Sequence, residues 1–416
     1  MTSAPRPDRT NLLLYLFGTG TWFASMGVQS VLFAWLVTIH LHETPEKVGL
    51  AQFSMMLPTL ALLLFGGVVA DRFGGARVAL LAQCASMVPV LGLAVLVGVD
   101  GLAYPLLIVY ALVMGTMQAF VTPARDGMLS QVAGVRVQRT VILASLVQFG
   151  VQIVGFSLAG LADVMGPFAV LGIQAAILAV GAAAFAMLGA RLRRAAAKAA
   201  AAAPPVAAIA PQRMVHAIRE GFETVRGSAD MRSVVLINIC VGLFFMGAFQ
   251  VGIPLLVREV HGGTPGQLAL VNGVHMAGIV LTTLVLLRLG DVHRRGRVLL
   301  LGVFGGAIGL AGMGLTSSFQ GLLFFNFCWG VTGGMVMSMS RTIMQEAAPP
   351  DRRGRVMSFF SLSFMGAGPL GALLSGYLVN ALGVHLALLT PAVVISGCAV
   401  VVALRTHLWR LQPMPA

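Results

Sequence analysis

Charged side chains are scarce in this sequence, and their scarcity excludes most soluble architectures. Asp, Glu, Lys and Arg together make up 10% of the 416 residues, whereas 58% of the residues are hydrophobic. A soluble domain with this composition could not cover its core with polar surface. The sequence therefore predicts an integral membrane protein.

Charge is also missing from the middles of the long hydrophobic segments, which contain no Asp, Glu, Lys or Arg. An ionised group at the centre of a bilayer is costly, so one that occurs there usually serves a function. Its absence argues against a strongly charged substrate held by a buried counter-ion. It also excludes a central carboxylate that could bind and release a proton within the membrane.

Motifs for metal, covalent or ATP chemistry are absent too. The four cysteines, Cys84, Cys240, Cys328 and Cys398, have no spacing typical of a metal site or a disulfide framework, and we expect them to be packing residues. No His-Glu-x-x-His motif or nucleophile with a nearby base indicates a membrane-embedded enzyme. No Gly-x-x-x-x-Gly-Lys-Ser/Thr loop indicates an ATP-driven pump. We therefore expect a protein that is not an enzyme and needs no metal or cofactor.

What the sequence does contain is a series of apolar segments long enough to cross a bilayer as helices, which takes about 20 residues. We expect twelve transmembrane helices, at 11–40, 46–70, 76–98, 102–124, 138–162, 166–190, 231–258, 265–289, 297–316, 318–344, 356–380 and 384–405. The first segment is too long for the core of a cleavable signal peptide. The predicted fold class is an all-α membrane protein of two pseudo-symmetric six-helix bundles.

The distribution of basic residues predicts the orientation. Of the 27 Lys and Arg residues, only Lys47 and Arg258 fall on the side opposite the termini. Positively charged loops stay in the cytoplasm, so we expect a multi-pass protein of the inner (plasma) membrane with both termini cytoplasmic. The net charge of +13 does not indicate a nucleic-acid partner, because the basic residues lie in short loops rather than on one soluble domain.

A hydrophilic stretch divides the chain into three predicted regions. We expect an N-terminal bundle at 1–190, a cytoplasmic linker at 191–230 and a C-terminal bundle at 231–416. Within the linker, apolar residues recur at helical spacing among charged ones and predict an amphipathic helix: Met214, Ile218, Phe222 and Val225. We interpret this region as a tether between the halves.

The two halves are internal repeats. Asp71, Arg77, Val78 and Leu80 recur 220 residues later as Asp291, Arg297, Val298 and Leu300. A second set recurs 216 residues later: Arg125, Arg139, Ser145, Gly150, Gly155 and Gly160 match Arg341, Arg355, Ser361, Gly366, Gly371 and Gly376. A duplicated six-helix unit is typical of a transporter that binds substrate at the bilayer midplane, between halves that rock.

With these features, the chain resembles the major facilitator superfamily. Gly67, Asp71, Arg72 and Gly74 fit that family's loop between spans two and three, although Gly75 and Ala76 stand where the family often has basic residues. Thr122–Arg125 and Arg219–Phe222 resemble the branch that contains the enterobactin exporter and macrolide efflux pumps. The resemblance implies export of siderophores, antibiotics or other amphipathic molecules, usually by proton antiport.

The resemblance also implies a charged gate. Asp71 is expected to close the cytoplasmic mouth by facing the start of the eleventh span and nearby basic groups, with Asp126 as a second acid. The candidate gating residues are Gly67, Asp71, Arg72, Gly74, Arg77, Arg125, Asp126, Asp291, Arg297, Arg341 and Arg355. Arg341, Arg352, Arg353 and Arg355 are expected to cluster around Glu346 and Asp351. The alternative is that these charges only fix the topology.

Neutral polar and aromatic residues remain as candidates for a substrate cavity. They are Trp22, Gln29, Gln148, Gln152, Asn238, Gln250, Asn272, His275, Asn326 and Trp329. Asn272 and His275 share a helix face, as do Asn326 and Trp329. The alternative is that these amides hydrogen-bond neighbouring helices. His275 titrates in a useful pH range and joins Asp71 and Asp126 as a candidate for proton coupling, although packing is the alternative role.

The leading hypothesis is a proton-coupled exporter of amphipathic small molecules that works by alternating access, as a monomer in the lipid bilayer. The alternatives on the same fold are an importer or facilitator of a neutral metabolite and a transporter of lysolipids. A purely structural scaffold would not need the duplicated charged loops.

Overall fold

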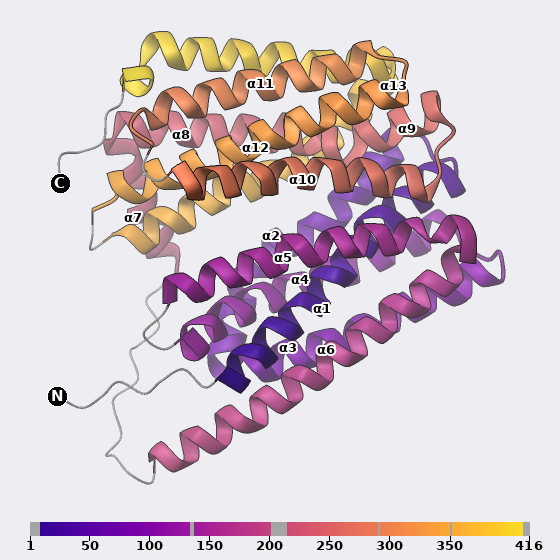
Figure 1. Cartoon of the computed structure of the whole chain (residues 1–416), viewed down its shortest axis with the longest axis vertical. Coiled ribbons are helices and arrows are strands. Elements are labelled where there is room, and N and C mark those ends of the chain that lie inside the picture. Colours follow the sequence, from indigo (N-terminus) through magenta and orange to yellow (C-terminus); the bar gives the residue numbers. More distant parts are fainter. Residues whose placement is uncertain (1–8, 134–136, 201–213, 290–291, 350–351, 411–416) are drawn as a thin grey trace. The chain divides into compact units, whose positions relative to one another are not determined.

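The computed structural model describes residues 9–133, 137–200, 214–289, 292–349 and 352–410, and these residues are almost entirely helical. Figure 1 shows long helices joined by short connections, with no strand in the described ranges. In a bilayer, helices satisfy every backbone hydrogen bond within one segment. The expected all-α membrane fold is confirmed.

The first repeat forms six long helices. They are α1 (Arg9–Trp35), α2 (Pro45–Phe73), α3 (Gly75–Gly98), α4 (Tyr104–Ala133), α5 (Val137–Gly160) and α6 (Ala162–Ala200). A π-helical turn, η1 (Leu36–His40), extends α1. The second helix bends by 57° between Pro45–Leu63 and Phe65–Phe73. Gly166 leaves helical geometry near the start of α6, with φ 83°.

The second repeat begins with the linker helix and a composite span. Its elements are α7 (Met214–Gly227), α8 (Ala229–Cys240), η2 (Val241–Phe245), η3 (Ala248–Gly252), α9 (Ile253–His261), α10 (Pro265–Leu289), α11 (Arg295–Leu315), α12 (Phe319–Ala347), α13 (Arg353–Arg405) and η4 (His407–Arg410). The helix from α8 to α9 is one span, Ala229–His261, interrupted by the two π-helical segments η2 and η3. Gly383 has φ 77° and divides α13 into 353–382 and 384–405.

The number of spans follows from these breaks. Within the described ranges, ten helices are long and apolar enough to cross a membrane, and the bent α2 is an eleventh. Because Gly383 divides the longest of the ten, the helices correspond to the twelve segments expected from hydropathy. The amphipathic pattern in the linker corresponds to α7.

The chain folds into two compact units that do not coincide with its two sequence halves. Unit 1 comprises Met1–Leu41, Ser54–Ile209 and Thr264–Leu270, and unit 2 comprises His42–Phe53, Ala210–Gly263 and Val271–Ala416. The start of α2 therefore belongs to unit 2, and the start of α10 belongs to unit 1. The domain boundaries at 190 and 230 stay a prediction.

The repeated glycines explain how the helices approach within each unit. In unit 1, a Cβ on Gly155 would collide with the Ala24 carbonyl, so only glycine lets α5 lie this close to α1. Its repeat partner Gly371 faces the Leu243 carbonyl in the same way, where α13 packs on η2 in unit 2. The sequence repeat is thus also a repeat of helix contacts.

A second pair of repeated glycines contacts the starts of α10 and α2, which belong to the opposite units. Gly160 lies against Gly266 and Ala269 at the start of α10, within unit 1. Its repeat partner Gly376 lies against Pro45 at the start of α2, within unit 2. The same position in each repeat therefore receives the tip of a helix from the other half of the sequence.

Candidate functional site

Four aromatic rings and one amide gather inside unit 2. The His275 ring centre lies 4.8 Å from that of Trp329 and 4.9 Å from that of Phe249. Phe245 approaches Trp329 edge-on at 5.4 Å. The Nδ1 atom of His275 is 3.2 Å from Oδ1 of Asn326, whose Nδ2 donates to the Val271 carbonyl at 2.7 Å. We call these five residues, Phe245, Phe249, His275, Asn326 and Trp329, the aromatic cluster.

Three spans build the aromatic cluster. His275 comes from the middle of α10, Asn326 and Trp329 come from one face of α12, and the two phenylalanines come from η2 and η3. A π-helical segment carries one extra residue per turn, so it shifts the register of the side chains that follow. Such segments frequently occur at functional sites. The cluster is therefore placed by local helix irregularity as well as by sequence spacing.

The members of the aromatic cluster differ in how deeply they are buried. Asn326 is fully buried and Trp329 is 3% exposed, whereas His275 and Phe249 are half-buried. The cluster bears no formal charge when His275 is neutral, and it offers aromatic faces beside one hydrogen-bonding ring. Such a surface suits an apolar or aromatic molecule, including a cation that stacks on a ring.

The other cavity candidates of unit 2 are Asn238, Gln250 and Asn272. Asn238 is buried on α8, and its Nδ2 has no hydrogen-bond partner among the described residues. Gln250 is half-buried on η3, and Asn272 is half-buried one turn before His275. From the sequence, His275, Asn326 and Trp329 are three of the ten cavity candidates, and of these three only Asn326 and Trp329 are expected to share a face; Phe245 and Phe249 are not among the ten.

The candidates of unit 1 lie mainly on α1 and α5. Trp22 and Gln29 are buried, and Gln29 Nε2 lies 3.2 Å from the Met55 sulfur. Gln148 and Gln152 are half-buried on α5, and neither side chain bonds to another described residue. Both remain candidates for a cavity wall.

Two further buried amides of unit 1, Gln83 and Gln174, were not among the predicted residues. Gln83 Nε2 donates to the Gly18 carbonyl at 3.1 Å, and Gln174 Nε2 contacts Oγ of Ser25 at 3.1 Å. Both side chains are fully buried and tie α1 to α3 and α6. The sequence shows the amides but not the backbone carbonyls that receive them, so their structural role could not be read from spacing.

The first charged loop lies at the end of α2. Asp71, Arg72, Gly74 and Arg77 are all exposed, and the positive φ of Gly74, 86°, makes the reversal into α3 possible. The Arg72 guanidinium lies 5.4 Å from the centre of the Phe73 ring. Asp71 forms no ion pair with a described residue.

Neighbouring candidates of unit 1 are paired differently. Gly67 faces Pro123 of α4, with 3.9 Å from a Cβ on the glycine to that of Pro123. Arg125 pairs with Asp126 at 2.8 Å and lies 4.9 Å from the Phe23 ring centre. Asp126 is therefore held by an arginine of its own helix, and its charge is largely balanced there.

The second set of charges has other partners than the spacing suggested. Glu346 pairs with Arg295, at the start of α11, and Arg355 pairs with Glu220 of α7. Arg341 is exposed and forms no ion pair with a described residue. Arg297 lies 5.0 Å from the Trp409 ring centre of η4. Asp291 and Asp351 lie outside the described residues.

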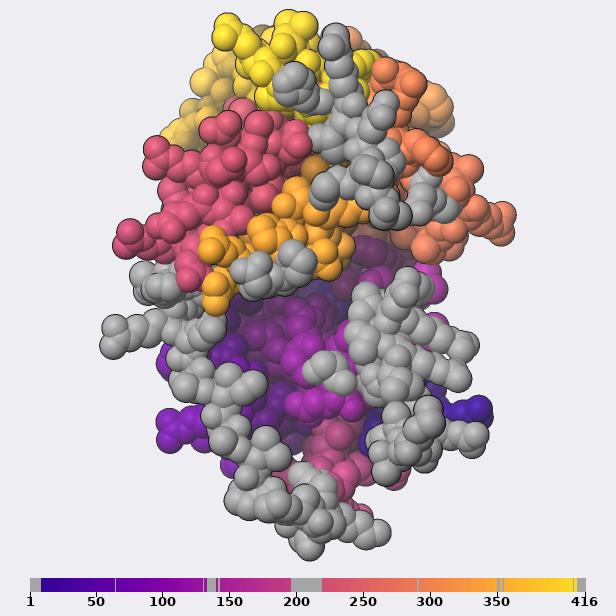
Figure 2. All heavy atoms as spheres, turned by 90° about the vertical axis from the view of Figure 1, so that its left-hand side faces the viewer, coloured from indigo at the N-terminus to yellow at the C-terminus, as the bar shows by residue number. Residues whose placement is uncertain are grey.

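The Arg219–Phe222 motif docks the linker helix on α13. Glu220 pairs with Arg355, and the Phe222 ring lies 5.8 Å from that of Phe359. A Cβ on Gly221 would lie 2.7 Å from the Arg355 carbonyl, so a side chain there would separate the helices. Helix α7 packs on α13. Figure 2 shows the rose and orange regions of unit 2 side by side. Among the described residues, no group of three or more His, Cys, Asp or Glu could hold a metal ion.

Comparisons with known proteins agree with this geometry. The family model described as Major Facilitator Superfamily matches residues 15–264 and 235–413. The chain is 26% identical over 403 residues to the multidrug efflux pump Tap of Mycolicibacterium fortuitum, covering 94% of this chain and 95% of that protein. It is 32% identical over 169 residues to the multidrug resistance protein MdtG of Dickeya zeae, covering 39% of this chain and 41% of that protein.

Solved structures show the same fold. The nucleoside transporter NupG superposes with a TM-score of 0.72 at 14% identity, covering 96% of this chain and 98% of that one. A bacterial homologue of the human lysosomal transporter Spinster, in an inward-facing and unoccupied conformation, gives a TM-score of 0.73 at 13% identity and covers 98% of both chains.

Proposed function

We propose, from the premise that this chain belongs to the Major Facilitator Superfamily, that it exports amphipathic small molecules in exchange for protons. A protein of this family is a multi-pass membrane transporter of small-molecule substrates and not an enzyme. The direction of transport, the substrate class and the coupling ion are the parts that we propose.

The observation that carries the substrate class is the aromatic cluster. The centres of its contacting rings lie 4.8 to 6.1 Å apart, and Asn326 is a buried hydrogen-bonding partner. An amphipathic ligand with a flat or aromatic part would stack there and would need only one or two polar contacts. The absence of Asp, Glu, Lys and Arg from the middles of the spans supports a ligand without strong charge.

The functions for which these relatives are named support export. The matches in Mycolicibacterium fortuitum and Dickeya zeae are named as a multidrug efflux pump and a multidrug resistance protein. We transfer export from these names to this chain as a proposal. The finer assignment to the enterobactin branch rests only on the two short motifs at Thr122–Arg125 and Arg219–Phe222.

Alternating access is the mechanism that we propose for this export. The halves 1–190 and 231–416 would rock as bodies, with the linker 191–230 between them and both termini in the cytoplasm. Asp71 and the basic residues of the charged loops would close the cytoplasmic mouth when they meet and open it when they part. The protein would do this as a monomer in the cell membrane.

Proton coupling needs a titratable group, and His275 is our first candidate. It is half-buried in the aromatic cluster, where a bound ligand would meet it, and its Nδ1 atom has a single amide partner. Asp71 and Asp126 are the other candidates, and both are exposed. A second function, facilitated movement of a neutral solute in either direction, is favoured by the absence of any carboxylate at mid-span.

Dye and antibiotic efflux from cells stripped of their own pumps would test the proposal. We expect active efflux that collapses when a protonophore dissipates the proton gradient. His275→Gln keeps a hydrogen-bonding side chain without a titratable group, so it should abolish uphill efflux while leaving downhill exchange. Efflux that continues in the presence of the protonophore would contradict proton coupling. Movement that only equalises the concentrations on the two sides of the membrane would favour the facilitator.

A further inference from the structure

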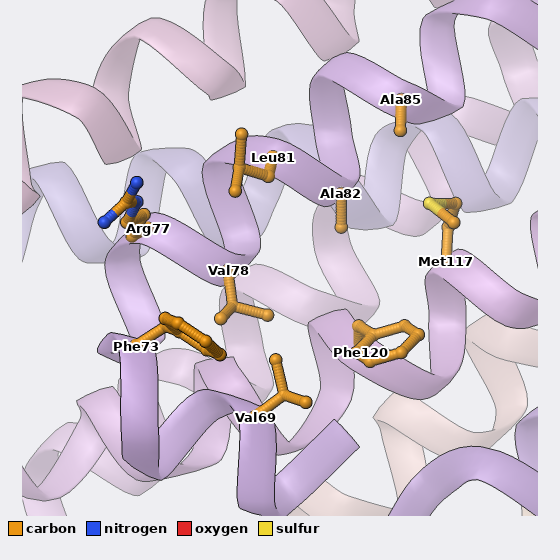
Figure 3. Close-up of a pocket in the computed structure, with 9 residues that line it drawn as sticks. All are labelled: Val69, Phe73, Arg77, Val78, Leu81, Ala82, Ala85, Met117 and Phe120. Atoms are coloured by element: carbon orange, nitrogen blue, oxygen red, sulfur yellow. The ribbon is translucent and has the colours of Figure 1, made fainter. Parts of the chain in front are cut away.

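A groove on unit 1 opens between the end of α2, the start of α3 and α4 (Figure 3). Its volume is about 410 Å³. The walls are apolar and include Phe73, Met117 and Phe120, and Arg77 is the one charged residue among the described residues that line it. The proposed transport function uses Arg77 as one of the basic residues of the charged loops, but it assigns no role to the apolar walls of this groove.

The groove faces the lipid side of the unit. Leu81, on its wall, is 58% exposed, and Val88 and Val95 follow on α3 at 71% and 56%. These residues are seven apart and share one helix face. Large apolar side chains exposed along a membrane-spanning helix contact acyl chains, so the groove is continuous with a lipid-facing surface.

Arg77 marks the end of the groove nearest the membrane surface. It lies in the first turn of α3, after the charged loop, and Figure 3 shows its guanidinium at the margin of the apolar walls. Its side chain is exposed and forms no hydrogen bond or ion pair with a described residue. Among the described residues that line the groove, none is acidic and able to balance this charge.

We propose that this groove binds one anionic phospholipid, with an acyl chain along the apolar walls and the phosphate at the Arg77 guanidinium. The pairing follows from charge and shape, because an apolar channel that ends at an unbalanced cation matches a chain that ends in an anion. A zwitterionic lipid offers the same chain without net charge, so Arg77 confers the preference between the two.

Lipid binding to the purified full-length protein, measured by native mass spectrometry, would test the proposal. The probes are phosphatidylglycerol and phosphatidylcholine with the same acyl chains. We expect the wild type to prefer phosphatidylglycerol. Arg77→Gln should weaken the binding of phosphatidylglycerol about fivefold and leave the binding of phosphatidylcholine unchanged. Arg77→Lys should keep the preference for phosphatidylglycerol.

A second variant tests the acyl chain separately. Ala85 is exposed on the groove wall, so the ring in Ala85→Phe should fill the groove and weaken the binding of both lipids. Val95→Phe adds a ring on the same face outside the groove and should change neither. The proposal would be overturned by an unchanged lipid preference in Arg77→Gln or by wild-type binding in Ala85→Phe. Neither result bears on export, because the readout is binding alone.

Discussion

At the scale of single residues, Trp329 holds the centre of the aromatic cluster. Three rings approach it, from His275, Phe245 and Phe249, at 4.8, 5.4 and 6.1 Å. Its 3% exposure shows that little of the ring is open in this conformation, so it supports the half-buried rings at the edge. Removing it should loosen the whole surface on which we place the ligand.

Trp329→Ala is therefore expected to raise the KM for an aromatic substrate about three- to tenfold, since aromatic pairs contribute about 0.5–1.5 kcal/mol beyond burial. Trp329→Phe should restore most of the loss. The measurement is concentration-dependent efflux from cells with matched expression. Trp35→Ala is the control, because Trp35 lies on α1 of unit 1, beside His40. Equal KM values for Trp329→Ala and the wild type would remove the cluster from the substrate site.

Residue spacing predicted one part of this cluster and could not predict the other. Asn326 and Trp329 are three apart on a regular helix, so a shared face follows from the helical period. Phe245 and Phe249 join them because η2 and η3 depart from that period. Such departures depend on packing against neighbouring helices, which no local pattern reports.

At the scale of elements, the repeated glycines divide into those that permit close contact and those that do not. Gly155 meets the backbone of α1, whereas Gly150, one and a half turns earlier on α5, has nothing within 4 Å of an added Cβ. Both positions recur in the second half of the sequence. Sequence identity alone therefore could not rank them.

Gly155→Val should reduce the yield of folded protein strongly, because two added methyl groups and a Cβ cannot fit beside the Ala24 carbonyl. Overpacking of this kind costs about 1–3 kcal/mol when the neighbour can move, and backbone cannot move easily. Gly150→Val is the matched control and should leave folding unchanged. The measurement is the melting temperature and monodisperse yield in detergent. Similar values for the two variants would contradict this assignment of the contact.

For the linker helix too, the sequence predicted the element but not its packing partner. The sequence predicted an amphipathic helix and a tether, and α7 is that helix. Its partner emerges only in three dimensions, where Glu220, Gly221 and Phe222 all face the start of α13. The Arg219–Phe222 motif is thus a docking motif in the structure, and whether it also identifies a branch of the family stays a prediction.

At the scale of the whole molecule, Asp71 connects the charged loop to the proposed transport cycle. It is exposed and has no ion pair with a described residue, whereas Asp126 already pairs with Arg125. In our proposal Asp71 meets the start of the eleventh span when the cytoplasmic mouth closes. A carboxylate that is free in one state and engaged in another can bias the equilibrium between them.

Asp71→Asn is accordingly expected to reduce efflux at least tenfold while leaving membrane insertion and melting temperature unchanged. The amide keeps the size of the side chain but cannot engage a helix N-terminus or an arginine as an anion. Asp100→Asn, in the exposed turn after α3, is the control and should transport normally. Wild-type efflux by Asp71→Asn would end the gating role.

The architecture was readable from the sequence because hydropathy and charge act locally along the chain. Apolar segments of sufficient length must be helical in lipid, and basic residues sort to one side of the membrane. Those two rules predicted the spans and the fold class before any contact was known, and residue identities at offsets of 220 and 216 predicted the repeat. The sequence did not reveal that the tips at His42–Phe53 and Thr264–Leu270 belong to the opposite units.

Tertiary structure decided which side chains meet. Glu346 pairs with Arg295 and Arg355 with Glu220, although spacing had grouped Glu346 with Arg341 and Arg355. Ion pairs and ring contacts depend on the register between helices that are far apart in sequence. That register is set by close backbone contacts such as Gly155 against Ala24, and the cost of a single misplaced Cβ is what selects it.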